Sequence, residues 1–305
     1  MSTADRAGTL LLVYNMDHRD LRIIAARPDG TQSIGRAVTL LRLVAAEGAP
    51  GASLSGLVEA SGLSKPTCRR ILMALIDAGL AEQDPLTRRY LLGPEAYVLG
   101  ALAAERFGIH RLALEGATRL AHETGDAAFV QVRRDWFAVC LHREDGTYPI
   151  RSHVLRAGDR YPLGAGAAGI ALLAALPDAD IVSALTANEQ LFADRYPTLT
   201  RSLLEDLVVE ARQQGYGFNR GLIFPGSWGM GMAVRDPQGR PDFCLSLAAI
   251  EGRMQPDRVP HLVRLLRTEV KRLETRLKSF AANSKTRATM APVAKGAPRR
   301  TSERR

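Results

Sequence analysis

The adjacent arginines Arg69 and Arg70, which follow the run Ser64-Lys65-Pro66-Thr67, are the residues of this sequence best suited to a definite chemistry. An arginine side chain can donate two parallel hydrogen bonds to a guanine edge or to a phosphate group. On an arbitrary helix, two arginines more often belong to an ordinary solvated face. The elements around this pair therefore decide between nucleic-acid recognition and a plain surface.

Patterns that would indicate an enzyme are weak in this chain. Residues 164–169 fit the spacing GxGxxG, but a dinucleotide site needs a strand directly before it, and residues 160–163 make a poor strand. Pro225 stands where a GxSxG nucleophile motif requires its first glycine. The six histidines lack metal-ligand spacing, and the three cysteines form neither a CxxC pair nor a disulfide framework. We expect no catalytic residues, no metal and no cofactor.

The region around the two arginines has the periodicity of three helices followed by two short strands. The predicted helices cover about residues 34–47, 53–61 and 64–78, and the strands lie within residues 80–92. Ser33, Ser53 and Ser64 stand where N-caps are expected. This order of elements predicts a winged helix-turn-helix.

The third predicted helix separates its apolar residues from its basic ones. At about 100° per residue, one face carries Cys68, Ile71, Leu72 and Leu75, and the opposite face carries Pro66, Arg70 and Met73, with Arg69 on the flank. The first face can pack on the other two helices. The second has the polar, basic character that a helix in the major groove of DNA requires.

Beyond residue 92 the chain is predicted to form a larger α+β domain. An Ala- and Leu-rich helix is expected over residues 92–106, and a second helix over residues 109–123. Pairs of strand-like segments joined by tight turns follow, at residues 127–141 and 229–249, with further helices at 167–176, 180–185, 203–214 and 260–280. Strands paired in this way predict a mainly antiparallel sheet covered by helices.

The net charge of +9 is concentrated in the last 25 residues. Residues 281–305 carry +6, which leaves only +3 for the rest of the chain. We expect this basic tail to be disordered, and either to add phosphate contacts or to be simply solvated. No apolar run is long enough for a membrane span or a signal peptide, so a cytoplasmic location is expected.

The segment Leu63-Ser64-Lys65-Pro66-Thr67-Cys68-Arg69-Arg70-Ile71-Leu72 resembles the recognition helix of IclR-type transcriptional regulators. Further segments resemble the same family, in the order expected: Tyr161-Pro162-Leu163 before the small-residue helix at 164–174, Gly215-Tyr216-Gly217, Met232-Ala233-Val234-Arg235-Asp236 and Leu245-Ser246-Leu247. The resemblance covers about residues 33–280. It implies a GAF-like effector domain, dimers or tetramers, and DNA binding that a small carboxylate or aromatic metabolite controls.

Several positions around the family's ligand pocket depart from its usual pattern. Ile170 replaces a common lysine, Gly229 a frequent cysteine, and Asn219-Arg220 a frequent acidic residue, while Ala248 stands where a second hydroxyl residue is frequent. Arg220 is therefore a candidate partner for an anionic ligand group, although a plain surface arginine is at least as common. The loop at 221–228 is suited either to covering a ligand or to a subunit contact.

The sequence thus predicts an α+β protein with an N-terminal winged helix-turn-helix and a C-terminal GAF-like effector domain. The predicted divisions are a flexible extension (1–32), a DNA-binding domain (33–91), a linker helix (92–106), an effector domain (107–280) and a disordered tail (281–305). The expected partners are double-stranded DNA, a small-molecule effector and further copies of the chain. The alternative is a small-molecule-converting enzyme with an N-terminal interaction module.

Two sets of site residues follow from these inferences. For DNA contact they are Ser53, Ser64, Lys65, Pro66, Thr67, Arg69, Arg70, Arg88 and Arg89. For effector contact they are Leu163, Gly164, Ala165, Gly166, Phe218, Asn219, Arg220, Trp228, Gly229, Met230, Ser246 and Ala248.

Overall fold

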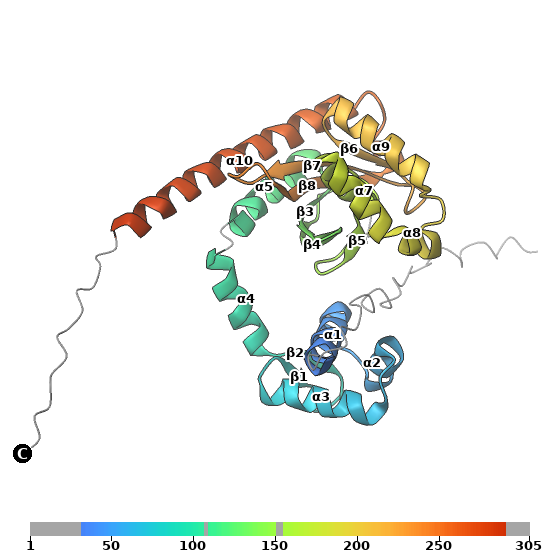
Figure 1. Ribbon diagram of the computed structural model, residues 1–305, viewed down its shortest axis with the longest axis vertical. Coiled ribbons are helices and arrows are strands. Elements are labelled where there is room, and N and C mark those ends of the chain that lie inside the picture. Colours follow the sequence, from blue (N-terminus) through green and yellow to red (C-terminus); the bar gives the residue numbers. More distant parts are fainter. Residues whose placement is uncertain (1–31, 107–108, 151–154, 291–305) are drawn as a thin grey trace, which may run out of the picture. The chain divides into compact units, whose positions relative to one another are not determined.

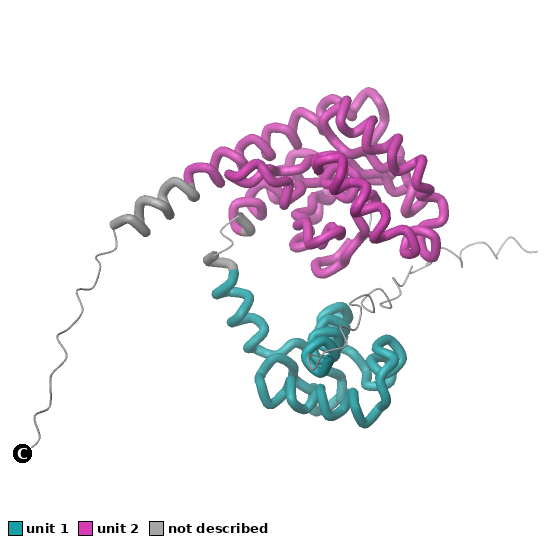
Figure 2. Tube along the Cα trace, in the orientation of Figure 1, with its two compact units in different colours: residues 1–107 teal, residues 108–305 magenta. Residues whose placement is uncertain are grey.

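The computed structural model describes residues 32–106, 109–150 and 155–290 (Figure 1). The chain divides into two compact units, Met1–Phe107 and Gly108–Arg305 (Figure 2). Of the predicted extension 1–32, only Gln32 is described, and it is the first residue of a helix. Within the described residues no helix combines the length and the apolar character needed to cross a bilayer.

The first unit is a winged helix-turn-helix, as predicted. Its elements are α1 (Gln32–Glu47), α2 (Leu54–Ser61), α3 (Lys65–Asp77), β1 (Ala81–Gln83), β2 (Tyr90–Leu92) and α4 (Pro94–Arg106). The two strands pair antiparallel and form the wing. Leu40, Leu57, Cys68 and Leu72 are buried in one core that joins the first three helices.

Local sequence signals fix where α2 and α3 begin and end. Ser53 and Ser64 are the N-caps of these helices, as predicted. Gly62 ends α2 with a φ of 67°, in the left-handed region that glycine adopts without strain. The prediction for Ser33 is wrong, because α1 begins one residue earlier at Gln32 and Ser33 lies inside the helix.

The second unit is a six-stranded antiparallel sheet with helices on both faces. Its elements are α5 (Ile109–Thr124), β3 (Ala127–Arg134), β4 (Phe137–Glu144), β5 (Arg160–Pro162), α6 (Gly166–Ala174), α7 (Asp178–Ala187), α8 (Glu189–Arg195), α9 (Arg201–Gln214), β6 (Gly217–Arg220), β7 (Ser227–Arg235), β8 (Pro241–Ile250), the 3-10 helix η2 (Glu251–Arg253) and α10 (Val259–Met290). The strand order is β5-β4-β3-β8-β7-β6, and every neighbouring pair is antiparallel.

Four of these elements were not expected from the sequence, and α10 runs well beyond its expected end. Residues 160–162 form the edge strand β5, where a proline is tolerated because one side of the strand makes no ladder. The short strand β6, the short helix α8 and the 3-10 helix η2 were also missed. Helix α10 continues to Met290, so residues 281–290 are helical rather than part of a disordered tail. Residues 291–305 lie outside the described part.

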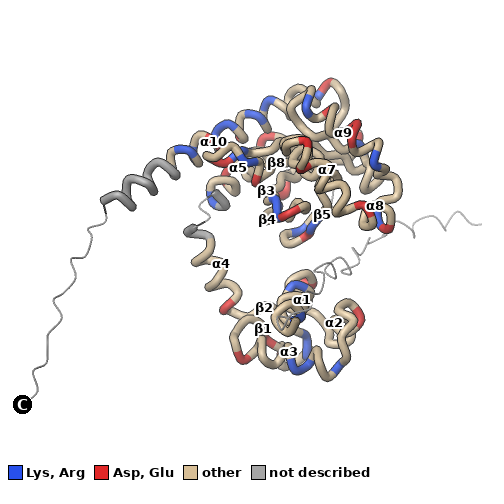
Figure 3. Tube along the Cα trace, viewed as in Figure 1, with Lys and Arg blue, Asp and Glu red and all other residues tan. Residues whose placement is uncertain are grey.

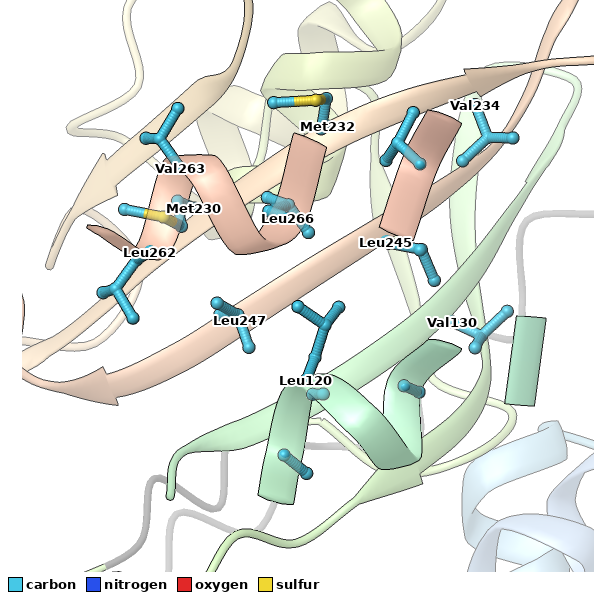
Figure 4. Close-up of a cluster of buried hydrophobic side chains, with 14 of the residues drawn as sticks. Leu120, Val130, Met230, Met232, Val234, Leu245, Leu247, Leu262, Val263 and Leu266 are labelled. Carbon is cyan, nitrogen blue, oxygen red and sulfur yellow. The ribbon is translucent and has the colours of Figure 1, made fainter. Parts of the chain in front are cut away.

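Helices α5 and α10 cover one face of the sheet. The core between them and the sheet is formed by every second residue of the strands. Alternate residues of β3, β7 and β8 point to this face. The buried side chains between the sheet and the two helices include Leu120, Val130, Met230, Met232, Leu245, Leu247 and Leu266 (Figure 4). Buried Glu269 joins the helices, because it accepts hydrogen bonds from Arg119 of α5 at 2.7 Å and from Arg272 at 2.6 Å.

Helix α6 lies on the opposite face, directly against glycines of β6 and β7. A Cβ atom added to Gly217 would lie 2.5 Å from the carbonyl oxygen of Ala167, and one added to Gly231 would lie 2.9 Å from the same oxygen. Both positions are paired across the strands. The helix can therefore approach the sheet this closely only because neither glycine has a side chain.

We predict that Gly231→Ala destabilises the second unit by about 1–3 kcal/mol, the usual cost of forcing an extra carbon into a packed region. Urea unfolding of the full chain measures this by tryptophan fluorescence, because both tryptophans, Trp136 and Trp228, belong to this unit. Gly252→Ala is the matched control, since a Cβ there meets no atom within 4 Å. Equal unfolding midpoints for the two variants would contradict the close packing of α6.

Candidate DNA-binding surface and ligand pocket

Helix α3 presents its basic residues on the side opposite to its buried ones. Cys68 and Leu72 have no exposed surface, and they hold the helix against α1 and α2. Lys65, Arg69 and Arg70 are exposed, and Figure 3 shows lysine and arginine positions on this helix. Arg69 and Arg70 make no hydrogen bond or ion pair to any residue that the structure describes, so their donors are available to a partner.

The hydroxyl residues in the predicted DNA-contact set first serve the helices themselves. Ser53 accepts a hydrogen bond from the N–H of Gly56 at 3.1 Å. Ser64 accepts one from the N–H of Thr67 at 3.4 Å, and the two hydroxyl oxygens lie 2.8 Å apart. These caps fix the N-terminus of α3, where the first backbone N–H groups lack partners within the helix. Pro66 is exposed in the same first turn.

The two wing arginines have different environments. Arg89 donates from Nη1 to the carbonyl oxygen of Gly51 at 2.8 Å and so fastens the wing to the loop between α1 and α2. Arg88 is exposed at the turn and has a φ of 60°, a left-handed conformation that is uncommon for a residue with a side chain. The Arg88 guanidinium has no hydrogen-bond partner among the described residues, whereas Arg89 holds the wing in place.

A pocket opens on the α6 side of the sheet in the second unit. It encloses about 490 Å³ of empty space, part of which is open to solvent. Its lining consists of Phe129, Gln131, Leu155, Tyr161, Ala165, Gly166, Ala167, Ala168, Asn219, Ile223, Phe224, Ser227, Trp228, Gly229, Ser246, Leu247 and Ala248. No aspartate, glutamate, lysine, arginine or histidine belongs to this described lining, so the pocket is apolar and aromatic with a few neutral polar groups.

Seven of the predicted effector-contact residues lie in this lining, and five do not. Those in the lining are Ala165, Gly166, Asn219, Trp228, Gly229, Ser246 and Ala248, and those outside it are Leu163, Gly164, Phe218, Arg220 and Met230. Strand alternation explains two of the exclusions: Met230 and Phe218 point to the α5–α10 face, opposite to their neighbours Gly229 and Asn219.

Leu163 and Gly164 pack elsewhere, although they are adjacent to the pocket in sequence. Leu163 is fully buried. A Cβ added to Gly164 would lie 2.8 Å from a methyl carbon of Leu204 and 3.5 Å from the ring of Phe192. The space beside Gly164 is therefore filled by side chains of α6, α8 and α9, and neither residue belongs to the lining of the pocket.

Arg220, the candidate anion partner, is already engaged. Its Nη2 lies 2.7 Å from Glu210 Oε1, and its guanidinium lies 4.5 Å from the centre of the Phe218 ring. The hydrogen bond to Glu210 raises the pKa of Arg220. A ligand anion would have to compete with a carboxylate that is already in place, so the prediction that Arg220 binds the ligand is not supported by this geometry.

The buried amides of the pocket have their oxygens occupied and their amino groups available. Gln131 accepts a hydrogen bond from the Ser246 hydroxyl at 2.8 Å through Oε1. Asn219 accepts one from the N–H of Leu222 at 2.9 Å through Oδ1. Neither amino group has a hydrogen-bond acceptor among the described residues, and both side chains are more than nine-tenths buried. The two amides can therefore donate to a ligand.

The N-terminus of α6 adds backbone donors to the same pocket. Ala165 caps this helix without a side-chain hydrogen bond, and Gly166, Ala167 and Ala168, the first residues of the helix, all line the pocket. Their N–H groups precede the first bond within the helix, and the helix dipole is positive at this end. Carboxylates and other anions bind favourably at such a position.

Sequence reasoning missed the residues that come from β3 and β5. Phe129, Gln131 and Tyr161 line the pocket. Gln131 carried a usable signal, because it is the one polar residue in the apolar run Ala127-Ala128-Phe129-Val130-Gln131-Val132. Tyr161 was missed together with its strand. Ile223 and Phe224 also line the pocket, and they come from the loop that had been expected to cover a ligand or contact a subunit.

The three cysteines are buried and unbridged. Burial raises the pKa of the Cys140 thiol to about 12, and it also raises the pKa of Cys244. A thiol acts as a nucleophile or metal ligand through its thiolate form. Neither Cys140 nor Cys244 is thus suited to redox or metal chemistry at neutral pH.

Each of the two units matches a model of a known protein family. Residues 101–275 match the family model described as "bacterial transcriptional regulator IclR C-terminal", and residues 33–85 match the "IclR helix-turn-helix domain". The glycerol operon regulatory protein of Streptomyces griseus is 28% identical over 237 residues, which cover 75% of this chain and 89% of that protein. The regulator KipR of Bacillus subtilis is 26% identical over 215 residues, or 70% of this chain and 84% of that protein.

A solved structure has the same fold. The crystal structure of an IclR homolog from Microbacterium hydrocarbonoxydans, complexed with 4-hydroxybenzoate, superposes with a TM-score of 0.66 at 19% sequence identity. The match covers 81% of this chain and 99% of that one. At this level of identity the likeness concerns the fold.

Proposed function

Because the chain belongs to the IclR family of bacterial transcriptional regulators, we propose that α3 lies in the major groove of an operator and that the α6 pocket holds the ligand that controls binding. The protein is a ligand-responsive, DNA-binding transcriptional regulator. The single observation that carries the proposed DNA contact is the free pair Arg69 and Arg70 on the exposed side of α3.

The other predicted contacts of this unit fit phosphate better than bases. Lys65 is exposed in the first turn of α3, where the helix dipole also favours an anion. Arg88 on the wing can reach a second phosphate, while Arg89 keeps the wing in place. Such contacts set the register of the protein on DNA and leave sequence selection to α3.

We predict that Arg70→Ala weakens operator binding by about 1–3 kcal/mol, roughly 5- to 150-fold in Kd, if Arg70 contacts a guanine. Binding to fragments from around the gene is measured near physiological salt with excess non-specific DNA. Arg264→Ala is the matched control, because it removes an arginine that is also exposed but lies on α10. Wild-type affinity in the Arg70 variant would remove this residue from the base-contacting set.

We propose that the regulator is a homodimer on a palindromic site, with two copies of α3 in successive major grooves. Helix α4 supports this proposal because it exposes an apolar stripe: Leu99 is 50% exposed and Leu102 is 62% exposed. Three-residue spacing places these two leucines on one helix face. A second copy of α4 would remove this surface from water. Further assembly to a tetramer is compatible with the same dimer.

We predict that Leu102→Asp converts the dimer to a monomer, because it places a charge in the middle of the proposed α4 contact. Light scattering after gel filtration reports the mass against the 33.1 kDa of one chain. Val209→Asp introduces the same charge at an exposed apolar residue of α9 and should leave the assembly unchanged. A Leu102→Asp protein with the wild-type mass would exclude α4 as the dimer contact.

We propose that the ligand is a small carboxylate, with an aromatic acid as the best fit to the pocket. The free donors of Gln131, Asn219 and the α6 N-terminus suit carboxylate oxygens, and the aromatic residues Phe129 and Phe224 of the lining suit a flat apolar body. Binding shifts the population of DNA-competent dimers through α4, which is followed by α5 after two residues. We also propose that the protein releases the ligand without converting it chemically. A further proposal is that the protein acts in the cytoplasm.

We predict that 4-hydroxybenzoate or a related monocarboxylate binds the wild-type protein and raises its Tm. Asn219→Asp should reduce the affinity for that monocarboxylate at least tenfold. The new carboxylate would replace a donor and repel the ligand anion. Gln213→Glu is the control, because it adds the same charge on the exposed side of α9. A panel of small carboxylates without any Tm shift would contradict the proposed ligand class, and recovery of a converted product would indicate an enzyme instead.

A further inference from the structure

The DNA-facing side of α3 contains an apolar strip among its arginines. Met73 is 44% exposed, and Pro66 and Ala74 are exposed beside it. Met73 follows Arg69 by four residues and Arg70 by three, so all three share one face of the helix. Buried Cys68, Leu72 and Leu75 point the other way. The core of the first unit therefore does not use the Met73 side chain.

The charge around Met73 selects the kind of partner that can cover it. Lys65, Arg69 and Arg70 all precede Met73 along the helix, and the one acidic residue of α3, Asp77, follows Met73 by four residues on the same face, so this face keeps a net positive charge. Two copies of this face would repel each other, and an apolar protein surface would have to desolvate three cations. A polyanion with an apolar feature inside its groove fits both properties.

The major groove of DNA offers one such apolar feature, the C5-methyl group of thymine. We infer that Met73 packs on a thymine methyl group and that this contact contributes to operator selection. The inference rests on the proposed placement of α3 in the major groove. It assigns to Met73 a specificity role that is separate from the hydrogen bonds of the arginines.

Helix geometry limits where this thymine can be. Three residues along a helix correspond to a rise of about 4.5 Å, and successive base pairs are separated by roughly 3.4 Å. A guanine contacted by Arg70 and the thymine contacted by Met73 are therefore within one or two base-pair steps of each other. Operator half-sites should carry a conserved guanine and thymine at this spacing.

The test uses DNA selected from a random library by the full-length protein. In each selected half-site, every thymine is replaced in turn by deoxyuridine, which removes the methyl group and keeps both the base pairing and the O4 acceptor. Kd is measured for the wild type, for Met73→Ala and for Met73→Leu. Val209→Ala, a truncation of an exposed apolar residue on α9, is the matched control. Circular dichroism checks that the variants keep their helices.

One thymine per half-site should lose about fourfold in wild-type affinity on replacement, the factor expected for one methyl group removed from water. Met73→Ala should bind thymine DNA less tightly by a similar factor and should show no further loss with deoxyuridine. Met73→Leu should retain most of the dependence on the methyl group, and Val209→Ala all of it.

Three results would overturn the inference: no thymine within two base pairs of the contacted guanine, no penalty for any deoxyuridine, or the same penalty in the wild type and Met73→Ala. Each of these leaves the proposed function intact if Arg70→Ala still weakens binding. Wild-type affinity in both the Arg69→Ala and Arg70→Ala variants would instead contradict the placement of α3 itself.

Discussion

The close approach of α6 to the sheet is the constraint on which the second unit depends. Gly217 and Gly231 are side by side in β6 and β7, and a Cβ atom at either would collide with the backbone of Ala167. The helix can therefore rest on bare backbone, with its first N–H groups at the edge of the pocket. Strand alternation then sends Met230, the large side chain next to Gly231, into the core under α5 and α10.

The pocket that results is neutral, because the charged groups near it are paired outside its lining. Arg220 is held by Glu210 and by the ring of Phe218. A ligand in the pocket therefore meets fixed dipoles and amide donors rather than a counter-ion. Such an arrangement stabilises an anion while avoiding the cost of burying an unpaired cation.

The winged helix-turn-helix could be predicted from the sequence in detail because its signals are local. Ser53 and Ser64 cap helices by contacts with residues three positions away, and the buried face of α3 follows from helical periodicity. The pocket could be predicted only in part, since it depends on which side of a strand each residue occupies. Phe218 points to the α5–α10 face of the sheet, away from the pocket. Gln131 comes from β3, which is far in sequence from the β8 residues that it pairs with.

Available hydrogen-bonding capacity, more than residue type, distinguishes the proposed binding residues from those with a structural role. Arg89 and Arg220 are arginines in the predicted sites, yet each already has a partner at hydrogen-bond distance. Arg70 has no such partner among the described residues, and Gln131 and Asn219 each keep an amino group without an acceptor. In the unliganded protein water can accept from these donors, and a ligand or DNA acceptor can take the place of that water. A donor that a protein acceptor already holds offers no such exchange, which is why Arg70, Gln131 and Asn219 suit the proposed sites better than Arg89 and Arg220.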